Sequence, residues 1–336
     1  MKYTDHPTGD GADFSLDVAL WAAYDTPLLL DDPADKTRAL AMATRRHPQP
    51  VGAVDEHGNW QTVRALVGAV QSPDFDSSDP DLRADFEAAW RTLAASTPGG
   101  TPQSDAVLMA LCVERHSMER NDFGVPFVDG LVARHGLLYV IEAQLAAMQY
   151  RVEEDWATKL VALVHRASAT RPDDGADPMT EAQWRLRTQL AAAPQAVYDA
   201  CAARVNAVIA GLAPACQIAL ALQFPDLPAM THGVLERLCA SDSEPVDAIH
   251  YLQLTATSDA ALARARAVDI DSYRTLWDWA GMTSTILLEH GVDAVRWLAP
   301  GAAHDAAGDA LTRIGTPEAI DALAAVPANR SARWPG

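Results

Sequence analysis

The feature that most constrains the fold of this chain is a series of predicted helices in residues 271–326, interrupted by single glycines. Residues 272–290 place apolar side chains at helical spacing on one face, namely Tyr273, Leu276, Trp277, Ala280, Leu287 and Leu288. Gly291 follows as the predicted left-handed end of that helix, and Gly315 repeats the stop. Thr316-Pro317-Glu318 then has the N-cap, the first-turn proline and the carboxylate that begin another helix. Helices separated by one glycine are typical of stacked helical repeats.

The same pattern occurs earlier in the chain. Residues 131–140 and 287–295 each contain a helix, a His-Gly stop and an apolar restart, at His135-Gly136 and His290-Gly291. A histidine in the last helical turn suits the negative end of the helix dipole, which is the structural explanation. A functional pair of histidines is the alternative. The repetition predicts an all-α fold, a degenerate HEAT-like α-solenoid of helical hairpins.

The charge balance restricts the class of partner. The 336 residues include 26 Lys plus Arg and 45 Asp plus Glu, which gives a net charge of -19. Such a field repels nucleic acid and anionic membrane surfaces and attracts a basic partner. Residues 205–225 carry no charge, but Gly211 and Pro214 predict two short buried helices there instead of a membrane span.

The cysteines and the N-terminus indicate a cytoplasmic protein. The four cysteines form no CxxC pair and lie in apolar surroundings, at Cys112, Cys201, Cys216 and Cys239. They are predicted to be reduced and buried. Residues 1–17 are polar and lack the apolar core of a signal peptide.

The breaks along the chain predict its organisation. We expect an N-terminal helical region in residues 1–100, middle helical repeats in 101–170, and C-terminal HEAT-like repeats in 181–336. Residues 168–180 are polar and proline-rich, which predicts a linker or a long loop. A short hairpin is expected only near residues 51–60, whereas a helix is predicted after Glu153 through Val164.

No catalytic motif is found. The chain has no HExxH, no Walker loop, no GxGxxG after a strand and no GxSxG elbow, so we predict no catalytic residue, cofactor or metal. Cys112 and His116 lie one helical turn apart, with Glu119 nearby, and these residues form the alternative, a metal-dependent enzyme with a site between helices.

Two groups of residues are candidates for partner binding. Trp277 and Trp279 lie about 200 degrees apart around one helix, so they cannot share a face. One of them can pack in the core, and the other either packs on a neighbouring repeat, through a second apolar stripe of Trp279, Met282 and Ile286, or is exposed and binds a partner. The acidic run 153–155 is predicted to stabilise the first turn of a helix, and secondarily to bind arginines. The candidates are Asp278, Trp279, Asp293, Trp297, Glu153, Glu154 and Asp155.

Two segments resemble known families. Residues 314–323, which read IGTPEAIDAL, resemble a HEAT-type repeat junction. Residues 131–145, with His135-Gly136 and Glu142-Ala143, resemble the helical region of large bacterial MolR-type proteins, some of which carry a WGR domain. No Trp-Gly-Arg motif stands in this chain, so the WGR part is not carried over. The HEAT resemblance implies a curved solenoid whose concave face binds another macromolecule.

Taken together, these features predict a cytoplasmic, non-enzymatic protein that binds a basic protein partner through an acidic surface. The concrete version is an immunity or inhibitor protein that neutralises a basic toxin or effector domain. Besides the metal-dependent enzyme, a scaffold subunit of a larger assembly is the remaining alternative. The oligomeric state is not predicted.

Overall fold

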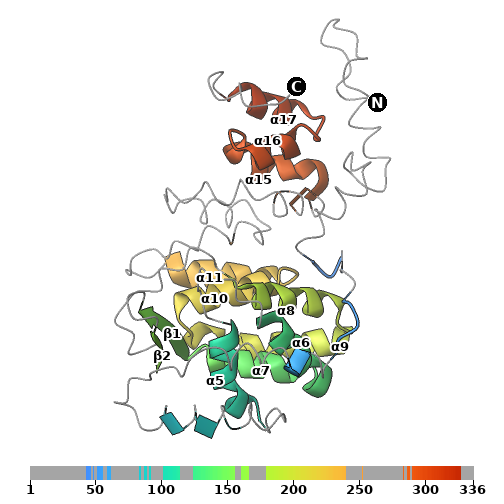
Figure 1. Cartoon of the computed structure of the whole chain (residues 1–336). Coiled ribbons are helices and arrows are strands. Elements are labelled where there is room, and N and C mark those ends of the chain that lie inside the picture. Colours follow the sequence, from blue (N-terminus) through green and yellow to red (C-terminus); the bar gives the residue numbers. More distant parts are fainter. Residues whose placement is uncertain are drawn as a thin grey trace, which may run out of the picture. The chain divides into compact units, whose positions relative to one another are not determined.

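The chain divides into two compact units (Figure 1). The terminal unit combines Met1–Met42 with Ile270–Gly336, and the central unit is Ala43–Asp269. The structure, a computed structural model, describes residues 43–46, 48, 51–55, 59–61, 83–84, 87–88, 91, 101–113, 124–155, 160–165, 179–239, 252, 283, 286–287 and 290–326.

The described part of the central unit is built mainly of helices. They are α5 (Pro102–Val113), α6 (Gly124–His135), α7 (Leu137–Ala147), α8 (Glu181–Ala192), α9 (Gln195–Asn206), the short 3-10 helix η3 (Ile209–Gly211), α10 (Pro214–Gln223) and α11 (Pro228–Cys239). The predicted all-α fold is confirmed, with one two-stranded hairpin added to it.

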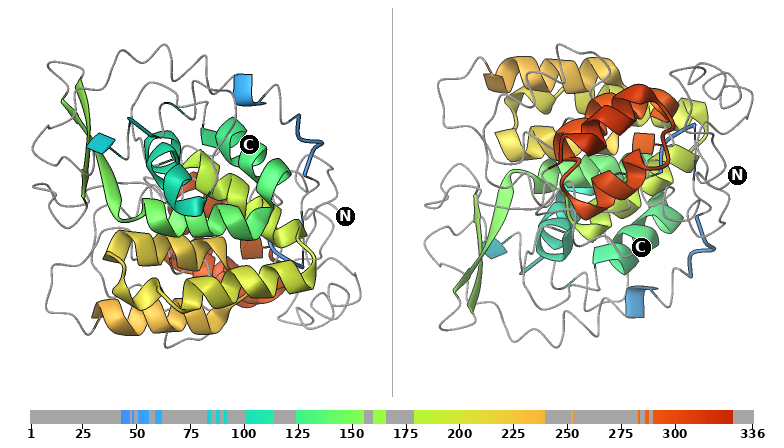
Figure 2. Two further views of the ribbon diagram at one scale, coloured as in Figure 1. Left: turned by 90° about the horizontal axis from the view of Figure 1, so that it is seen from below. Right: turned by 90° about the horizontal axis from the view of Figure 1, so that it is seen from above.

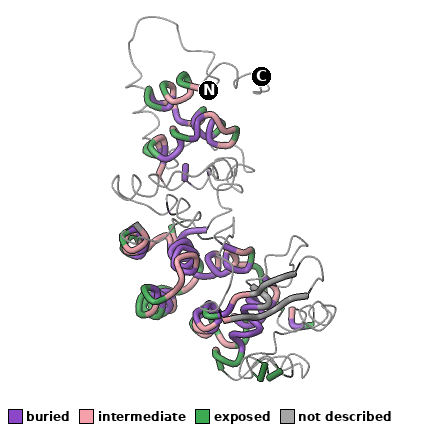
Figure 3. The backbone as a smooth tube through the Cα atoms, turned by 90° about the vertical axis from the view of Figure 1, so that its left-hand side faces the viewer, coloured by how far each residue is buried: buried purple, intermediate pink, exposed green. Residues whose placement is uncertain are grey.

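Alternate helices of the central unit pack on one another. α5 packs on α7 and α7 on α9, while α6 packs on α8 and α8 on α10. Figure 3 shows the buried residues on the sides of the helices that face each other. The largest side chains of this core include Phe127, Leu131, Ile141, Leu186, Ile218 and Phe224.

The helix ends follow the sequence signals. Thr180 and Gln183 form the predicted capping box, because Thr180 N donates to Gln183 Oε1 (2.9 Å) and Gln183 N donates to Thr180 Oγ1 (3.4 Å). Prolines open the following helices, with Pro194 before α9 and Pro214 and Pro228 as first residues of α10 and α11. The uncharged segment 205–225 is broken at η3, as predicted.

The strands are the main correction to the sequence analysis. β1 (Tyr150–Asp155) pairs antiparallel with β2 (Leu160–His165), with Tyr150 opposite His165 and Asp155 opposite Leu160. The helix predicted through Val164 is therefore wrong, because a short apolar run also fits a strand that pairs with a neighbour. The hairpin lies at one end of the helices of its unit (Figure 2).

The hairpin predicted near residues 51–60 is not found in its described part. Residues 51–55 belong to no strand, and residues 59–61 are helical. The Asn59 amide donates to the Asp55 carbonyl (2.9 Å), so the backbone turns into a helix where the sequence suggested a strand.

The described part of the terminal unit consists of short helices. They are η5 (Gly291–Ala294), α15 (Val295–Leu298), η6 (Ala299–Gly301), α16 (Asp305–Leu311) and α17 (Pro317–Ala324). Thr316 caps α17 by accepting from the amide of Ala319 (3.3 Å), as predicted. No helix among the described residues is long and apolar enough to cross a membrane.

The sequence-based domain boundaries stay a prediction. Residues 166–178, which hold most of the expected linker, lie outside the described residues. The helix that follows, α8, packs on α5, α6 and α10 within the central unit.

Candidate functional site

The structure places some of the predicted partner-binding residues and leaves others outside the described part. Asp278 and Trp279 lie outside the described residues. Asp293 is exposed in the first turn of η5. Trp297 is buried in α15 at 6% exposure, which is a packing role and not an exposed anchor.

The acidic run Glu153, Glu154 and Asp155 lies in β1. Its predicted role in the first turn of a helix is wrong, because these residues pair with β2. They face Ala162, Val161 and Leu160 across the ladder, so no basic residue stands opposite them in the register. A role in binding arginines stays a prediction.

The residues of the alternative metal site are not assembled by the described structure. Cys112 lies in α5, and His116 and Glu119 lie outside the described residues. Within the described ranges, no group of three or more His, Cys, Asp or Glu could hold a metal ion. Cys201 and Cys216 are free and buried, as predicted, and burial raises the pKa of the Cys201 thiol to about 11, with a smaller contribution from the Glu142 carboxylate.

The junction between α6 and α7 forms a compact polar cluster. Gly136 has φ 83° and ψ 166°, a conformation that is almost restricted to glycine. Its amide donates to the Val132 carbonyl (2.9 Å) and closes α6. The last residue of α6, His135, stacks on Tyr139 of α7, with ring centroids 4.2 Å apart and planes at 19°.

Asp105 of α5 lies beneath this junction. The Tyr139 hydroxyl donates to Asp105 Oδ2 (2.6 Å), and Asp105 is 1% exposed. Burial raises the pKa of this carboxyl, against the hydrogen bond from Tyr139 and the charges of His135 and Arg134. Asp105 Oδ1 and His135 Nε2 are buried and have no hydrogen-bond partner. The cluster thus contains a carboxyl whose neutral form is favoured, beside an imidazole.

The second His-Gly junction, in the terminal unit, is built differently after its glycine. Gly291 has φ 57°, and η5 begins at this residue. His290 stacks on Trp297, with ring centroids 4.0 Å apart and planes at 12°. Both glycines therefore have positive φ, as predicted, and both histidines stack on an aromatic side chain of a later residue. Gly315 is described but is not among the glycines with positive φ.

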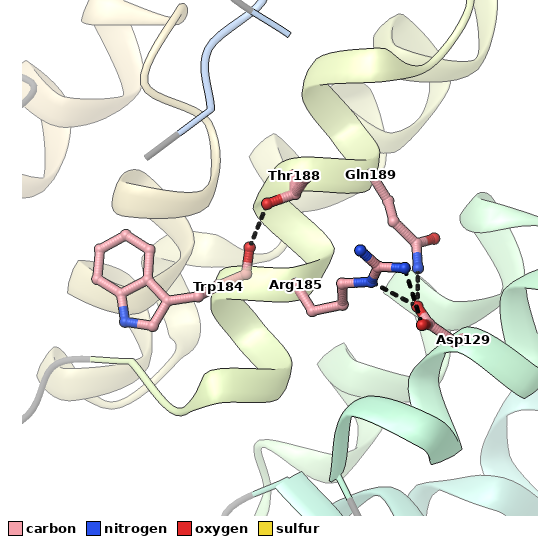
Figure 4. A network of polar contacts seen from close by, with 5 residues as sticks. All are labelled: Asp129, Trp184, Arg185, Thr188 and Gln189. Carbon is pink, nitrogen blue, oxygen red and sulfur yellow. Dashed lines mark hydrogen bonds and ion pairs between the residues drawn. The ribbon is translucent and has the colours of Figure 1, made fainter. Parts of the chain in front are cut away.

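A partly buried ion pair connects α6 to α8 (Figure 4). Arg185 binds both oxygens of Asp129, through Nε at 2.8 Å and Nη2 at 2.9 Å, and Gln189 donates to Oδ1 of the same carboxylate. On the side of α8 away from Asp129, the Thr188 hydroxyl donates to the Trp184 carbonyl (3.1 Å) within the helix. Both oxygens of the Asp129 carboxylate accept from α8, so this cluster joins α6 to α8.

Sequence reasoning missed the Asp105 and Asp129 clusters, because their partners are distant in the chain. Asp105 and Tyr139 are 34 residues apart, and Asp129 and Arg185 are 56 apart. The available signal was an isolated acidic residue within an otherwise apolar helix at each position.

Comparison with known proteins gives one match. Residues 59–273 match the family described as the YehI second domain. No curated protein and no solved structure matches the chain. The resemblances to HEAT-type and MolR-type proteins remain predictions. Because the matched segment covers more than half of the 336 residues, the chain belongs to the YehI second domain family.

Proposed function

We propose that this chain is a cytoplasmic, non-enzymatic helical repeat protein that binds a basic protein partner through an acidic surface. In its concrete form, the partner is a toxin or effector domain, and the chain is the immunity or inhibitor protein that neutralises it.

The observation that carries this proposal is the packing of alternate helices. α7 joins α5 to α9, α8 joins α6 to α10, and α6 also packs on α5 and α7, which is compatible with stacked helical hairpins of a repeat protein. Such arrays present extended surfaces that bind other macromolecules. This packing supports the HEAT-like solenoid expected from the sequence.

The exposed carboxylates of the terminal unit suggest the chemistry of the partner. Every acidic residue of the described stretch 290–326 is exposed, namely Asp293, Asp305, Asp309, Glu318 and Asp321. The same stretch has only two arginines, Arg296 and Arg313. Asp305 and Glu318 also stabilise the first turns of α16 and α17, whereas Asp309 lies further along its helix. The surplus of negative charge favours a basic partner and a fast association that depends on salt.

Native purification with mass spectrometry tests the proposal. The D293N/D309N variant removes two carboxylates from the terminal unit. Its matched control, E181Q/E236Q, removes two exposed carboxylates from the central unit and changes the net charge equally. We expect the wild-type chain and the control to retain a stoichiometric basic protein at low salt, and D293N/D309N to lose it. A stoichiometric small molecule in place of a protein partner would contradict the proposal, as would equal retention by both variants.

A further inference from the structure

Arg45 contacts helix ends that are far away in the sequence. Its Nη1 donates to the carbonyls of Leu190 (3.2 Å) and Ala193 (2.9 Å), and its Nη2 donates to Oε1 of Gln195 (3.0 Å). The guanidinium carbon lies 4.5 Å from the centre of the Tyr198 ring. Several acceptors beside an aromatic face are the environment that a planar guanidinium prefers. We call this set of groups, together with the Asp226 carboxylate, the Arg45 site.

The helices of the central unit form the Arg45 site through their own contacts. Leu190 and Ala193 stand at the end of α8, where the helix dipole is negative, and the Leu190 carbonyl also accepts from the Ala193 amide (3.2 Å). Gln195 Nε2 donates to Asp199 Oδ1 (2.8 Å), which directs Oε1 toward the guanidinium. Tyr198 is 2% exposed and packs against Phe224, with ring centroids 5.5 Å apart. The receptor groups are thus held in place independently of Arg45.

The electrostatics of the site favour a cation. The Asp226 carboxylate accepts from the Arg45 backbone amide at 3.2 and 3.3 Å. Burial, and next the charge of Asp226, raise the pKa of the Tyr198 hydroxyl against the charges of Arg45 and Arg187. Arg187 is 3% exposed and donates to the carbonyls of Ala43 (3.0 Å) and Leu222 (3.0 Å), so it binds the backbone next to Arg45.

Arg45 leaves part of the site unused. The Tyr198 hydroxyl is buried and has no hydrogen-bond partner, although the guanidinium lies over its ring. A buried polar atom without a partner is unfavourable, because it has lost its hydrogen bonds to water. The occupant also comes from outside the helical array: residues 43–46 belong to no helix or strand and precede the matched segment 59–273.

We propose that the Arg45 site is a binding site for a guanidinium group, which the chain's own Arg45 fills in the free protein and an arginine of the basic partner fills in the complex. The claim that the partner supplies the second arginine rests on the proposed function, whereas the claim that the site binds a guanidinium group does not. Displacement of Arg45 would release residues 43–46 from the end of α8 and the start of α9. Binding of the partner's arginine would therefore free the first residues of the central unit.

The first experiment empties the site and offers it a guanidinium. The R45A variant and the wild-type chain are titrated with Nα-acetyl-arginine amide, with Nα-acetyl-lysine amide as the matched ligand. We expect arginine amide to raise the Tm of R45A saturably by about 2 °C, and lysine amide to leave it unchanged. The wild-type chain and the R46A control should require about tenfold more ligand, because the tethered Arg45 competes.

A folded R45A whose Tm responds to neither ligand, or equally to both, overturns the proposal and leaves Arg45 a structural contact only. If R45A does not fold, hydrogen exchange of the wild-type chain decides. A high concentration of arginine amide should accelerate exchange of the Arg45 backbone amide, which is bound to Asp226, more than lysine amide does. Equal exchange in both ligands overturns the proposal. Because neither experiment uses the protein partner, failure of the wild-type chain to retain a basic protein in the purification experiment would refute the proposed function alone.

Discussion

The two His-Gly junctions have the same sequence signal and different surroundings. In both, a histidine at the end of a helix stacks on a later aromatic ring, and the following glycine has positive φ. After Gly136 comes the eleven-residue α7, whereas after Gly291 come η5 and the four-residue α15. Tyr139 is half-buried and bound to Asp105, while Trp297 is buried at 6% exposure.

This difference shows which part of a junction the motif determines. The glycine allows the backbone to change direction, and the histidine gains an aromatic neighbour. The position of the aromatic residue determines what the junction contributes to the core. Tyr139 connects its junction to α5 through one hydrogen bond to Asp105. Trp297 instead contributes a buried ring to the core of the terminal unit.

Removing the aromatic ring should destabilise the two junctions by clearly different amounts. Trp297→Ala should lower the free energy of unfolding of the terminal unit by about 3–5 kcal/mol, since it leaves a large cavity. Tyr139→Ala should cost the central unit less, because its ring is only half-buried. Hydrogen exchange with mass spectrometry reports each unit separately. An equal cost of the two substitutions would show that burial does not distinguish the junctions.

The glycines should differ in what can replace them. A Cβ at Gly136 would meet nothing within 4 Å, so the cost of Gly136→Ala, about 1–3 kcal/mol, comes from backbone conformation alone. Asparagine should be no better there, because ψ 166° lies outside the left-handed helical region. At Gly291, φ 57° is a value that asparagine adopts more readily. Thermal denaturation of G136N and G291N checks this, and equal losses would contradict it.

The Asp105 carboxyl should make the first junction sensitive to pH. Because its pKa is raised in the folded chain, the stability it contributes is present below its ordinary pKa of 3.8 and is lost as the pH rises through the folded value. Asp105→Asn keeps an acceptor for Tyr139 and cannot ionise. Relative to the wild-type chain, it should therefore gain stability as the pH rises above 3.8, because the wild-type carboxyl then ionises more readily in the unfolded chain than in the folded one. Urea denaturation at several acidic pH values measures the difference in unfolding free energy between the variant and the wild-type chain. A difference that does not change with pH would contradict the prediction.

The surface of the first junction should matter least for folding. Leu138 is 38% exposed, so its side chain reaches the surface beside this junction. Leu138→Ser should change the free energy of unfolding by less than about 0.5 kcal/mol. If this surface takes part in partner binding, retention of the partner should fall while the urea midpoint stays constant. A loss of stability above this range would instead make Leu138 a core residue.

The elements that sequence analysis predicted correctly are encoded locally. The capping box of Thr180 and Gln183, the start of α17 at Thr316 and the turn at His135-Gly136 each depend on a few adjacent residues. Their backbone requirements can be read from those residues alone. The hairpin at Tyr150 was not predicted, because β2 is a short apolar run that fits a buried helix equally well.

The functional candidates depend on contacts over long sequence separations. The Arg45 site joins residues that are 145 to 181 positions apart, and the Asp105 cluster joins two helices. The adjacent Arg45 and Arg46 carry no local pattern that indicates the acceptors of Arg45. Such sites follow from the packing of helices, which composition and periodicity do not specify.

The ion pair between Asp129 and Arg185 has a consequence for how the array assembles during folding. Helices of similar length can pair with the wrong neighbour. An arrangement that buried Asp129 away from Arg185 and Gln189 would leave its carboxylate without these donors, which is unfavourable. The pair therefore disfavours misassembled arrays and lets α6 distinguish α8 from the other helices of the unit.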